Sequence, residues 1–131
     1  MNKLAFIIST QVHEKIQLAA MIASIHATVG GEVLFFVSMN GVLAFQKGKE
    51  LKDRIIPEGE FSKLMLSKNV PNFINILKQI KAIGDVRIYA CSMAMDVLGW
   101  DIKDLEEGLF DDVIGLTSFL DMAEDAKILF V

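Results

Sequence analysis

The only cysteine of this chain, Cys91, is the residue whose type and position best suit it to chemistry. The β-branched and aromatic residues 86–90 predict a buried strand that ends at Cys91, and the apolar spacing after it predicts a helix. At a strand-to-helix junction, unpaired backbone N–H groups and the positive end of the helix dipole favour a thiolate. Because the thiolate is the nucleophilic form of cysteine, this position favours sulfur chemistry at Cys91.

The first turn of that predicted helix would provide hydrogen-bond donors for a charged sulfur. The backbone N–H groups expected near the sulfur, where they could stabilise a thiolate or a persulfide, belong to Ser92, Met93 and Ala94. The alternative is a buried, inert Cys91, since free cysteine is among the most buried residue types. No second cysteine is present to resolve an oxidised sulfur, which argues against an autonomous dithiol redox cycle.

Polar and flexible residues also follow the first two predicted strands. Thr10 and His13 come after the first strand, and Asn40 and Gly41 come after the second. Because sites in parallel sheets lie at the carboxyl ends of strands, these four residues are candidate neighbours of Cys91. His13 would serve as a general base or hydrogen-bond partner if the strand ends are adjacent, although a polar residue in the first turn of a helix is the commoner explanation.

Several other classes of site lack sequence support. A metal site is not expected, because the chain has only two histidines and one cysteine and lacks Cys-x-x-Cys or His-x-x-x-His spacing. A nucleotide site is not expected either, because the sequence contains no G-x-G-x-x-G or P-loop pattern. We therefore expect no cofactor. Residues 96–125 contain ten acidic side chains and one basic one, which argues against nucleic acid as a partner. No apolar run is long enough for a membrane span. The lone cysteine and the absence of a signal-peptide pattern favour a cytoplasmic protein.

The elements that must position these residues alternate between strand and helix. Apolar runs predict five strands, over residues 3–9, 32–38, 86–90, 111–116 and 127–131. Helices are predicted over 13–29, over 71–83, after Cys91 and from Ser118. In the first of them, helical spacing is shown by Leu18, Met21, Ile22, Ile25 and Val29. The last begins with a weak capping box formed by Ser118 and Asp121. In the 71–83 helix, the inward side chains are expected to be Phe73, Ile76, Leu77, Ile80 and Ile83. This alternation predicts an α/β fold with a mostly parallel sheet covered on both faces.

We expect one domain over residues 1–131, interrupted by an irregular insert at 47–70 that holds one or two helical turns around 60–66. Such a segment is either a functional lid, an interaction element or a simple surface excursion. The apolar fraction of 53% is high against 23% charged residues, which favours an apolar surface covered by other subunits.

Three segments of the chain resemble the DsrE/DsrF/TusD-like family of small sulfur-relay proteins, most closely its DsrE-type, peroxiredoxin-like branch. They are residues 33–42, the cysteine motif 88–99, and 118–131. The resemblance implies a three-layer α/β/α sandwich with a mostly parallel five-stranded sheet, assembled as a homotrimer or homohexamer. It also implies a sulfurtransferase component, in which Cys91 accepts sulfur as a persulfide and passes it to a partner protein.

Two other functions stay open at this point. One is a non-catalytic oligomeric module, in which the apolar surface and the acidic C-terminal third bind partners. The other is a small-ligand or thiol-redox protein that uses the same strand ends.

Overall fold

The computed structural model describes residues 2–131 and contains a five-stranded sheet in which every neighbouring pair of strands is parallel. The strand order is β4-β3-β2-β1-β5. This arrangement confirms the predicted fold class, and even the short edge strand β4 runs parallel to its neighbour. The strands are β1 (Leu4–Ile8), β2 (Val33–Val37), β3 (Val86–Cys91), β4 (Asp112–Ile114) and β5 (Lys127–Phe130).

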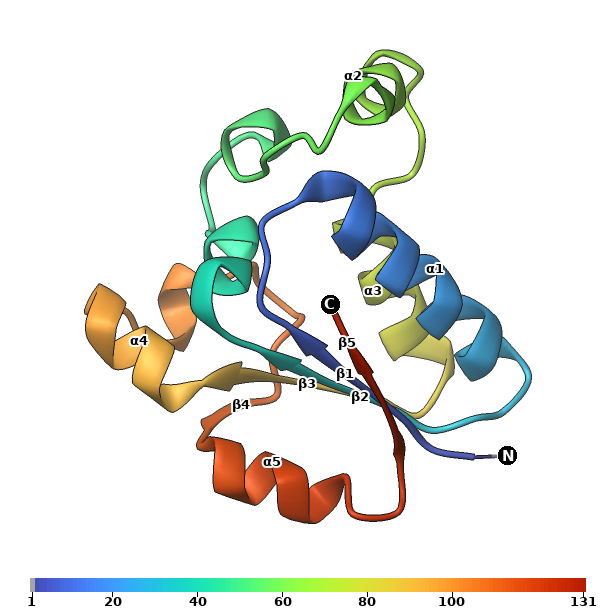
Figure 1. Cartoon of the computed structure of the whole chain (residues 1–131), viewed down its shortest axis with the longest axis vertical. Coiled ribbons are helices and arrows are strands. Elements are labelled where there is room, and N and C mark those ends of the chain that lie inside the picture. The colour runs from blue at the N-terminus through green and yellow to red at the C-terminus, as the bar shows by residue number, and fades with distance from the viewer. Residues whose placement is uncertain (1) are drawn as a thin grey trace.

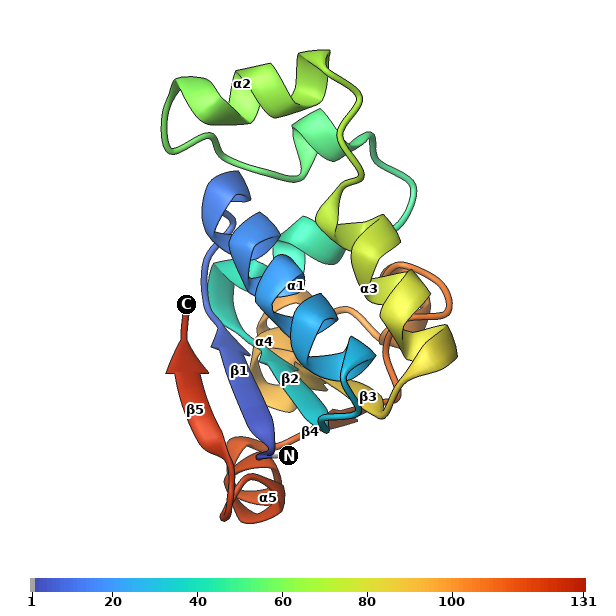
Figure 2. The ribbon, with the colours of Figure 1, turned by 90° about the vertical axis from the view of Figure 1, so that its right-hand side faces the viewer.

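Helices cover both faces of the sheet. Figures 1 and 2 show α1 and α3 side by side on one face and α5 on the other, whereas α4 extends beyond the carboxyl end of β3. The α-helices are α1 (His13–Thr28), α2 (Glu60–Ser67), α3 (Phe73–Ile83), α4 (Ser92–Leu98) and α5 (Leu116–Met122). Three short 3-10 helices are η1 (Met39–Phe45), η2 (Leu51–Asp53) and η3 (Ile102–Asp104). None of the helices within residues 2–131 combines the length and the apolar character that a bilayer crossing requires.

The central strand β2 shows why the sheet needs cover on both sides. All five of its residues are buried, and successive side chains point to opposite faces. On one face, Phe35 stacks on Phe6 of β1, with ring centroids 4.7 Å apart. On the other, Phe36 packs at 5.0 Å against Phe119 of α5. The apolar run of β2 is continuous in the sequence because both faces of the strand are buried.

Helix α1 buries its alanines together with Ile16, and most of its other large apolar side chains point outward. The core side is formed mainly by alanines, among them Ala19, Ala23 and Ala27, which let the helix approach the sheet and α3 closely. The apolar residues that predicted the helix lie on the solvent side, at Leu18, Met21, Ile22, Ile25 and Val29. A helix that is apolar on both sides is typical of an element covered by another protein surface.

Three local expectations need correction. Ile83 of α3 is exposed, and Ile74 takes an inward position instead. Helix α3 begins after Asn72, whose side chain accepts a hydrogen bond from the backbone N–H of Asn75, so Pro71 lies outside the helix. Helix α5 begins at Leu116 after Gly115, which places Ser118 inside the helix and removes its expected capping role.

The insert, residues 47–70, projects past the carboxyl ends of the strands as η2 and α2 (Figures 1 and 2). Backbone pairing ties it to the start of α1, where the N–H of His13 donates to the carbonyl of Ile56 at 2.9 Å. The Glu14 carboxylate accepts hydrogen bonds from the backbone N–H groups of Glu58, Gly59 and Ser62. These contacts hold the insert against the body of the protein.

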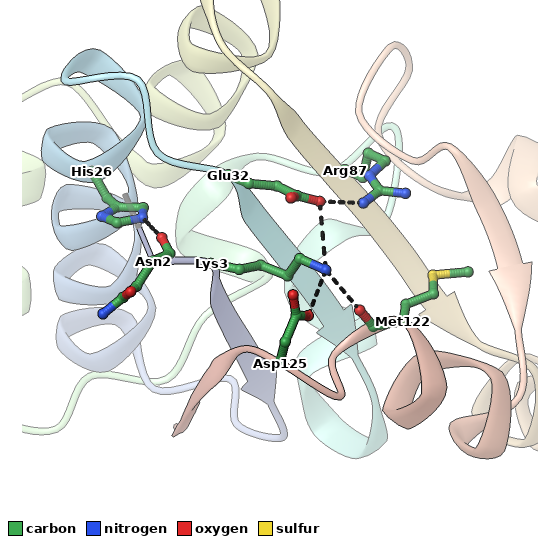
Figure 3. Close-up of polar contacts among 7 residues, drawn as sticks. All are labelled: Asn2, Lys3, His26, Glu32, Arg87, Met122 and Asp125. Carbon is green, nitrogen blue, oxygen red and sulfur yellow. Dashed lines mark hydrogen bonds and ion pairs between the residues drawn. The ribbon is translucent and has the colours of Figure 1, made fainter.

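Charged side chains join the strands at the opposite, amino end of the sheet (Figure 3). Lys3 Nζ lies 2.9 Å from Asp125 and donates at 3.1 Å to the carbonyl of Met122. Glu32 pairs with Arg87 and lies 4.0 Å from Lys3. The network links β1, β3, the start of β2 and the end of α5.

Candidate functional site

Cys91 is the last residue of β3 and the residue that precedes α4. Its backbone stays extended, with φ −69° and ψ 121°, and it pairs in register with Ile114 of β4. The next residue already belongs to α4, so the thiol lies at the strand-to-helix junction that the sequence predicts. The side chain makes no capping hydrogen bond to α4, and the residue is only 5% exposed in the isolated chain.

Helix α4 presents its first-turn amides directly after the cysteine. Ser92, Met93 and Ala94 form that first turn, where backbone N–H groups have no acceptor within the helix. The helix is short and ends at Gly99, which adopts the left-handed conformation with φ 70°. The N–H of Trp100 then donates to the carbonyl of Met95, which closes the helix and turns the chain back. The predicted donors are therefore next to Cys91 in the chain and in the helix.

An apolar groove lies between η1 and α4, along the helix that follows Cys91, and Cys91 is not among its lining residues. It has a volume of about 250 Å³, and Asn40 contributes the polar part of its lining. Met93 and Val97 of α4 line the groove and are exposed, Val97 to 78%. The remaining lining side chains are Met39, Leu43, Ala94 and Leu98. The structure thus places Asn40 next to the helix that follows Cys91.

Gly41 has a steric role under this groove. Its N–H donates to the carbonyl of Ser38, and a Cβ at Gly41 would lie 2.8 Å from the backbone oxygen of Ile8. Only glycine lets η1 lie this close to the end of β1 without a shift of the backbone. Gly41 therefore positions the η1 wall of the groove through its lack of a side chain.

Thr10 and His13 belong to a different cluster from Cys91. Strand β2 separates β1 from β3, so the two strand ends are not adjacent. The Thr10 hydroxyl accepts a local hydrogen bond from the N–H of Val12. The His13 ring, which is 1% exposed, bonds through Nδ1 to the hydroxyl of Ser62 at 2.6 Å.

Burial and hydrogen bonding together set the charges of the second cluster, which consists of His13, Glu14 and Ser62. Burial lowers the pKa of His13 below its ordinary value of 6.5, and the nearby Glu14 carboxylate opposes the shift only in part. Burial tends to raise the pKa of Glu14, but the three backbone hydrogen bonds from the insert outweigh it and lower that pKa. The cluster therefore holds a neutral imidazole and an ionised carboxylate at neutral pH.

Sequence reasoning missed the two buried polar partners of this cluster. Ser62 lies 49 positions after His13, and Gln17 donates through Nε2 to the carbonyl of Pro71 at 2.9 Å. Because His13 and Gln17 are four residues apart, they lie on one face of α1, and this spacing was the sequence signal that could have predicted a polar cluster. Nothing in the sequence indicates which segment faces them.

The chemistry that Cys91 offers is that of a thiol nucleophile. Within the described range 2–131, no three His, Cys, Asp or Glu side chains come together as a metal-ligand group. Cys91 is the free thiol, with first-turn amides beside it and an apolar groove along the adjoining helix.

Comparisons with known proteins agree with the fold. The family model described as the DsrE/DsrF-like family matches residues 2–131. Two solved structures have the same fold over the full length of both chains, each at 17% identity. One is MTH1491 from Methanobacterium thermoautotrophicum, a protein of unknown function, with a TM-score of 0.63, and the other is the ychN protein from E. coli, with a TM-score of 0.65. No curated protein matches the sequence.

Proposed function

The chain belongs to the DsrE/DsrF-like family, and from this we propose that it is a sulfur carrier that holds sulfur as a persulfide on Cys91. The observation that carries the proposal is the position of the only cysteine, at the end of β3 and directly before the first turn of α4. First-turn amides stabilise negative charge on sulfur, both in the thiolate and in the persulfide. A carrier needs one such sulfur and no resolving cysteine.

The transfer step balances with Cys91 and one donor persulfide. The Cys91 thiolate attacks the outer sulfur of a donor R–S–SH, a new S–S bond forms, and the donor S–S bond breaks. The donor leaves as the thiolate R–S⁻, and Cys91 becomes a persulfide. In the second half, an acceptor thiolate attacks the outer sulfur of Cys91–S–SH and releases the Cys91 thiolate. No external oxidant or reductant is required.

Access to the sulfur is the demanding part of this function. Cys91 is 5% exposed, so a donor protein has to reach it through a movement of the surrounding surface. The groove formed by η1 and α4 does not include Cys91, but Met93 and Val97 expose apolar surface there, on the helix that follows the cysteine. We place the donor or acceptor protein on this groove, with its cysteine directed at the start of α4.

Mass spectrometry of the intact protein tests the proposal. Incubation with a low-molecular-weight persulfide donor should add the mass of one sulfur to the wild-type chain and none to Cys91→Ser. Because serine is nearly isosteric with cysteine, the variant should retain the fold, and circular dichroism checks this. Addition of sulfur to Cys91→Ser, or no addition to the folded wild type with any persulfide donor, would refute a carrier role for Cys91.

Self-association is the second part of the proposal, as a homotrimer or homohexamer. The outer face of α1 supports it, since Ile25 is 70% exposed and its large neighbours are also apolar. A groove of about 370 Å³ continues this face to the edge strand β5, where Phe130 is exposed. We propose that a second copy of the chain covers this surface.

Native mass spectrometry measures the assembly. Ile25→Glu should shift the population to smaller species, because a carboxylate would be buried against an apolar partner surface. Gln79→Glu is the control: it adds the same charge at an exposed position of α3, outside the apolar face of α1, and should leave the assembly intact. A monomeric wild type at micromolar concentration would contradict this part alone.

A non-catalytic interaction module is the second candidate, and the burial of Cys91 favours it. In that case the exposed apolar residues serve assembly and the cysteine is a core residue. Alkylation by iodoacetamide separates the two functions: a carrier reacts in the folded assembly, whereas a module reacts only after denaturation.

A further inference from the structure

A second cavity, separate from the groove between η1 and α4, lies where α1, η2 and the α2–α3 connection meet. Its volume is about 150 Å³, comparable to engineered cavities that admit a benzene-sized molecule. Its polar lining residues are His13, Gln17, Asn69 and Asn72, and Leu51 and Leu66 are among the apolar ones. It shares no lining residue with the groove between η1 and α4.

Gln17 leaves one hydrogen-bond acceptor unused in this region. The side chain is 4% exposed, and its Nε2 donates to the carbonyl of Pro71. Because a carbonyl only accepts, this contact fixes the amide orientation and assigns the other position to Oε1. Gln17 Oε1 is buried and has no hydrogen-bond partner among residues 2–131. Buried acceptors without a donor are rare in folded proteins and destabilise them, so a donor from a water or a ligand is expected here.

The other polar side chains that line the cavity already make some hydrogen bonds within the protein, and their remaining donors and acceptors are available to a ligand. Asn72 Oδ1 accepts the backbone N–H of Asn75 at 3.0 Å with one of its two lone pairs, and the N–H donors of Nδ2 are also left on this side chain. The His13 ring uses Nδ1 for Ser62. No Asp, Glu, Lys or Arg lines the cavity, and the buried His13 is neutral, so a charged ligand would lose its hydration without gaining a counter-charge.

We propose that this cavity binds a small neutral amide, with the ligand N–H donating to Gln17 Oε1 and the ligand carbonyl accepting from Asn72 Nδ2. A short alkyl group on the amide would pack against Leu51 and Leu66. The ligand would contact α1, η2 and the start of α3 together, and so would hold the insert to the body of the protein. This site does not depend on Cys91 or on sulfur transfer.

Propionamide is a suitable probe, and NMR of the isotope-labelled full-length protein is the direct measurement. We expect saturable shifts at millimolar concentration, as suits so small a ligand, and nuclear Overhauser contacts to the methyl groups of Leu51 and Leu66 and to the His13 ring. Propionate and propylammonium, which have the same shape with a charge, should give no saturable shifts. Three outcomes would each overturn the proposal: equal binding of propionate, no saturable shift with propionamide, or ligand contacts to Phe61 and Leu64. These two residues line a neighbouring apolar groove that also includes Gln17.

Two variants test the named hydrogen bonds. Gln17→Met removes the acceptor and should weaken propionamide binding by about tenfold. Asn72→Asp removes the donor but keeps the carboxyl oxygen that caps α3, so the fold is retained and binding should fall by about the same factor. If Gln17→Met does not fold, Asn72→Asp decides the question. Cys91→Ser is the control and should bind propionamide as the wild type does, and unchanged affinity in Asn72→Asp would refute the assigned contact.

Discussion

The two ends of the parallel sheet differ in the side chains that they gather. At the amino end, Lys3, Glu32, Arg87 and Asp125 neutralise one another in a network near the surface (Figure 3). At the carboxyl end, Cys91 is the free thiol, and its side chain makes no capping hydrogen bond. Ion pairs join the strands at one end, whereas the thiol at the other end pairs with no group of the helix that follows it. The difference agrees with the general location of sites in parallel α/β sheets.

The ends also differ in how tightly the backbone is packed. At Gly41, near the carboxyl ends, an added Cβ would meet the backbone oxygen of Ile8. At Gly31, near the amino ends, the nearest atoms would be those of the His26 side chain, and at Gly84 the nearest backbone oxygen would be 3.3 Å away. The closest approach of an added Cβ to backbone is therefore at Gly41, in the η1 wall of the groove.

The largest effect is expected from Gly41→Ala, which should destabilise the fold by about 1–3 kcal/mol because η1 has to move away from β1. Thermal unfolding followed by circular dichroism measures the change. Gly59→Ala is the matched control, since its Cβ would meet nothing within 4 Å and its φ of −164° suits any residue. A Gly41→Ala protein as stable as Gly59→Ala would show that the carboxyl end is not tightly packed.

The sequence was sufficient to predict the fold because the strands are continuous apolar runs. An apolar run that is continuous, or short and flanked by turns, has few alternatives to a strand. The strand that ends at Cys91 was located to within one residue. The junction itself followed from this, as did the first-turn position of Ser92.

Sequence reasoning failed where two patterns on one element compete. In α1, large apolar residues and alanines occupy different stripes, and periodicity alone does not tell which stripe faces the sheet. The outcome depends on the space available, because only the alanines permit the close contact with α3. The cluster around His13 was missed for a related reason. Its partner Ser62 comes from the insert, which has no strong pattern of its own.

An intermediate effect is expected from pH at the carboxyl end, through His13. Its pKa is lowered in the folded protein by burial, so between its ordinary value of 6.5 and the lower folded value the unfolded chain binds more protons. The stabilising contribution of neutral His13 is therefore complete above about pH 6.5 and declines as the pH falls below it. His13→Asn, which retains a hydrogen-bonding group but does not titrate, should show a flatter dependence of unfolding free energy on pH.

The control for this prediction is the other histidine. His26→Gln retains His13, so its pH dependence should stay steeper than that of His13→Asn. Urea unfolding at several pH values between about 5 and 8 measures both variants, within the range where histidine titrates. An unchanged slope in His13→Asn would mean that the folded and unfolded chains bind the proton at His13 equally well.

The smallest effect is expected at the amino end, from Lys3→Met. The hydrogen bond to Asp125 raises the pKa of Lys3, but Asp125 is largely exposed and Glu32 keeps Arg87 as a partner after the change. Ion pairs of this kind contribute little and are screened by salt. The melting temperature should therefore fall less than in Gly41→Ala, and the difference from wild type should shrink in about 0.5 M salt. Persulfide formation at Cys91 and propionamide binding should stay at wild-type levels, because both lie at the other end of the sheet. A loss of either activity in folded Lys3→Met would show that the two ends are coupled through the strands.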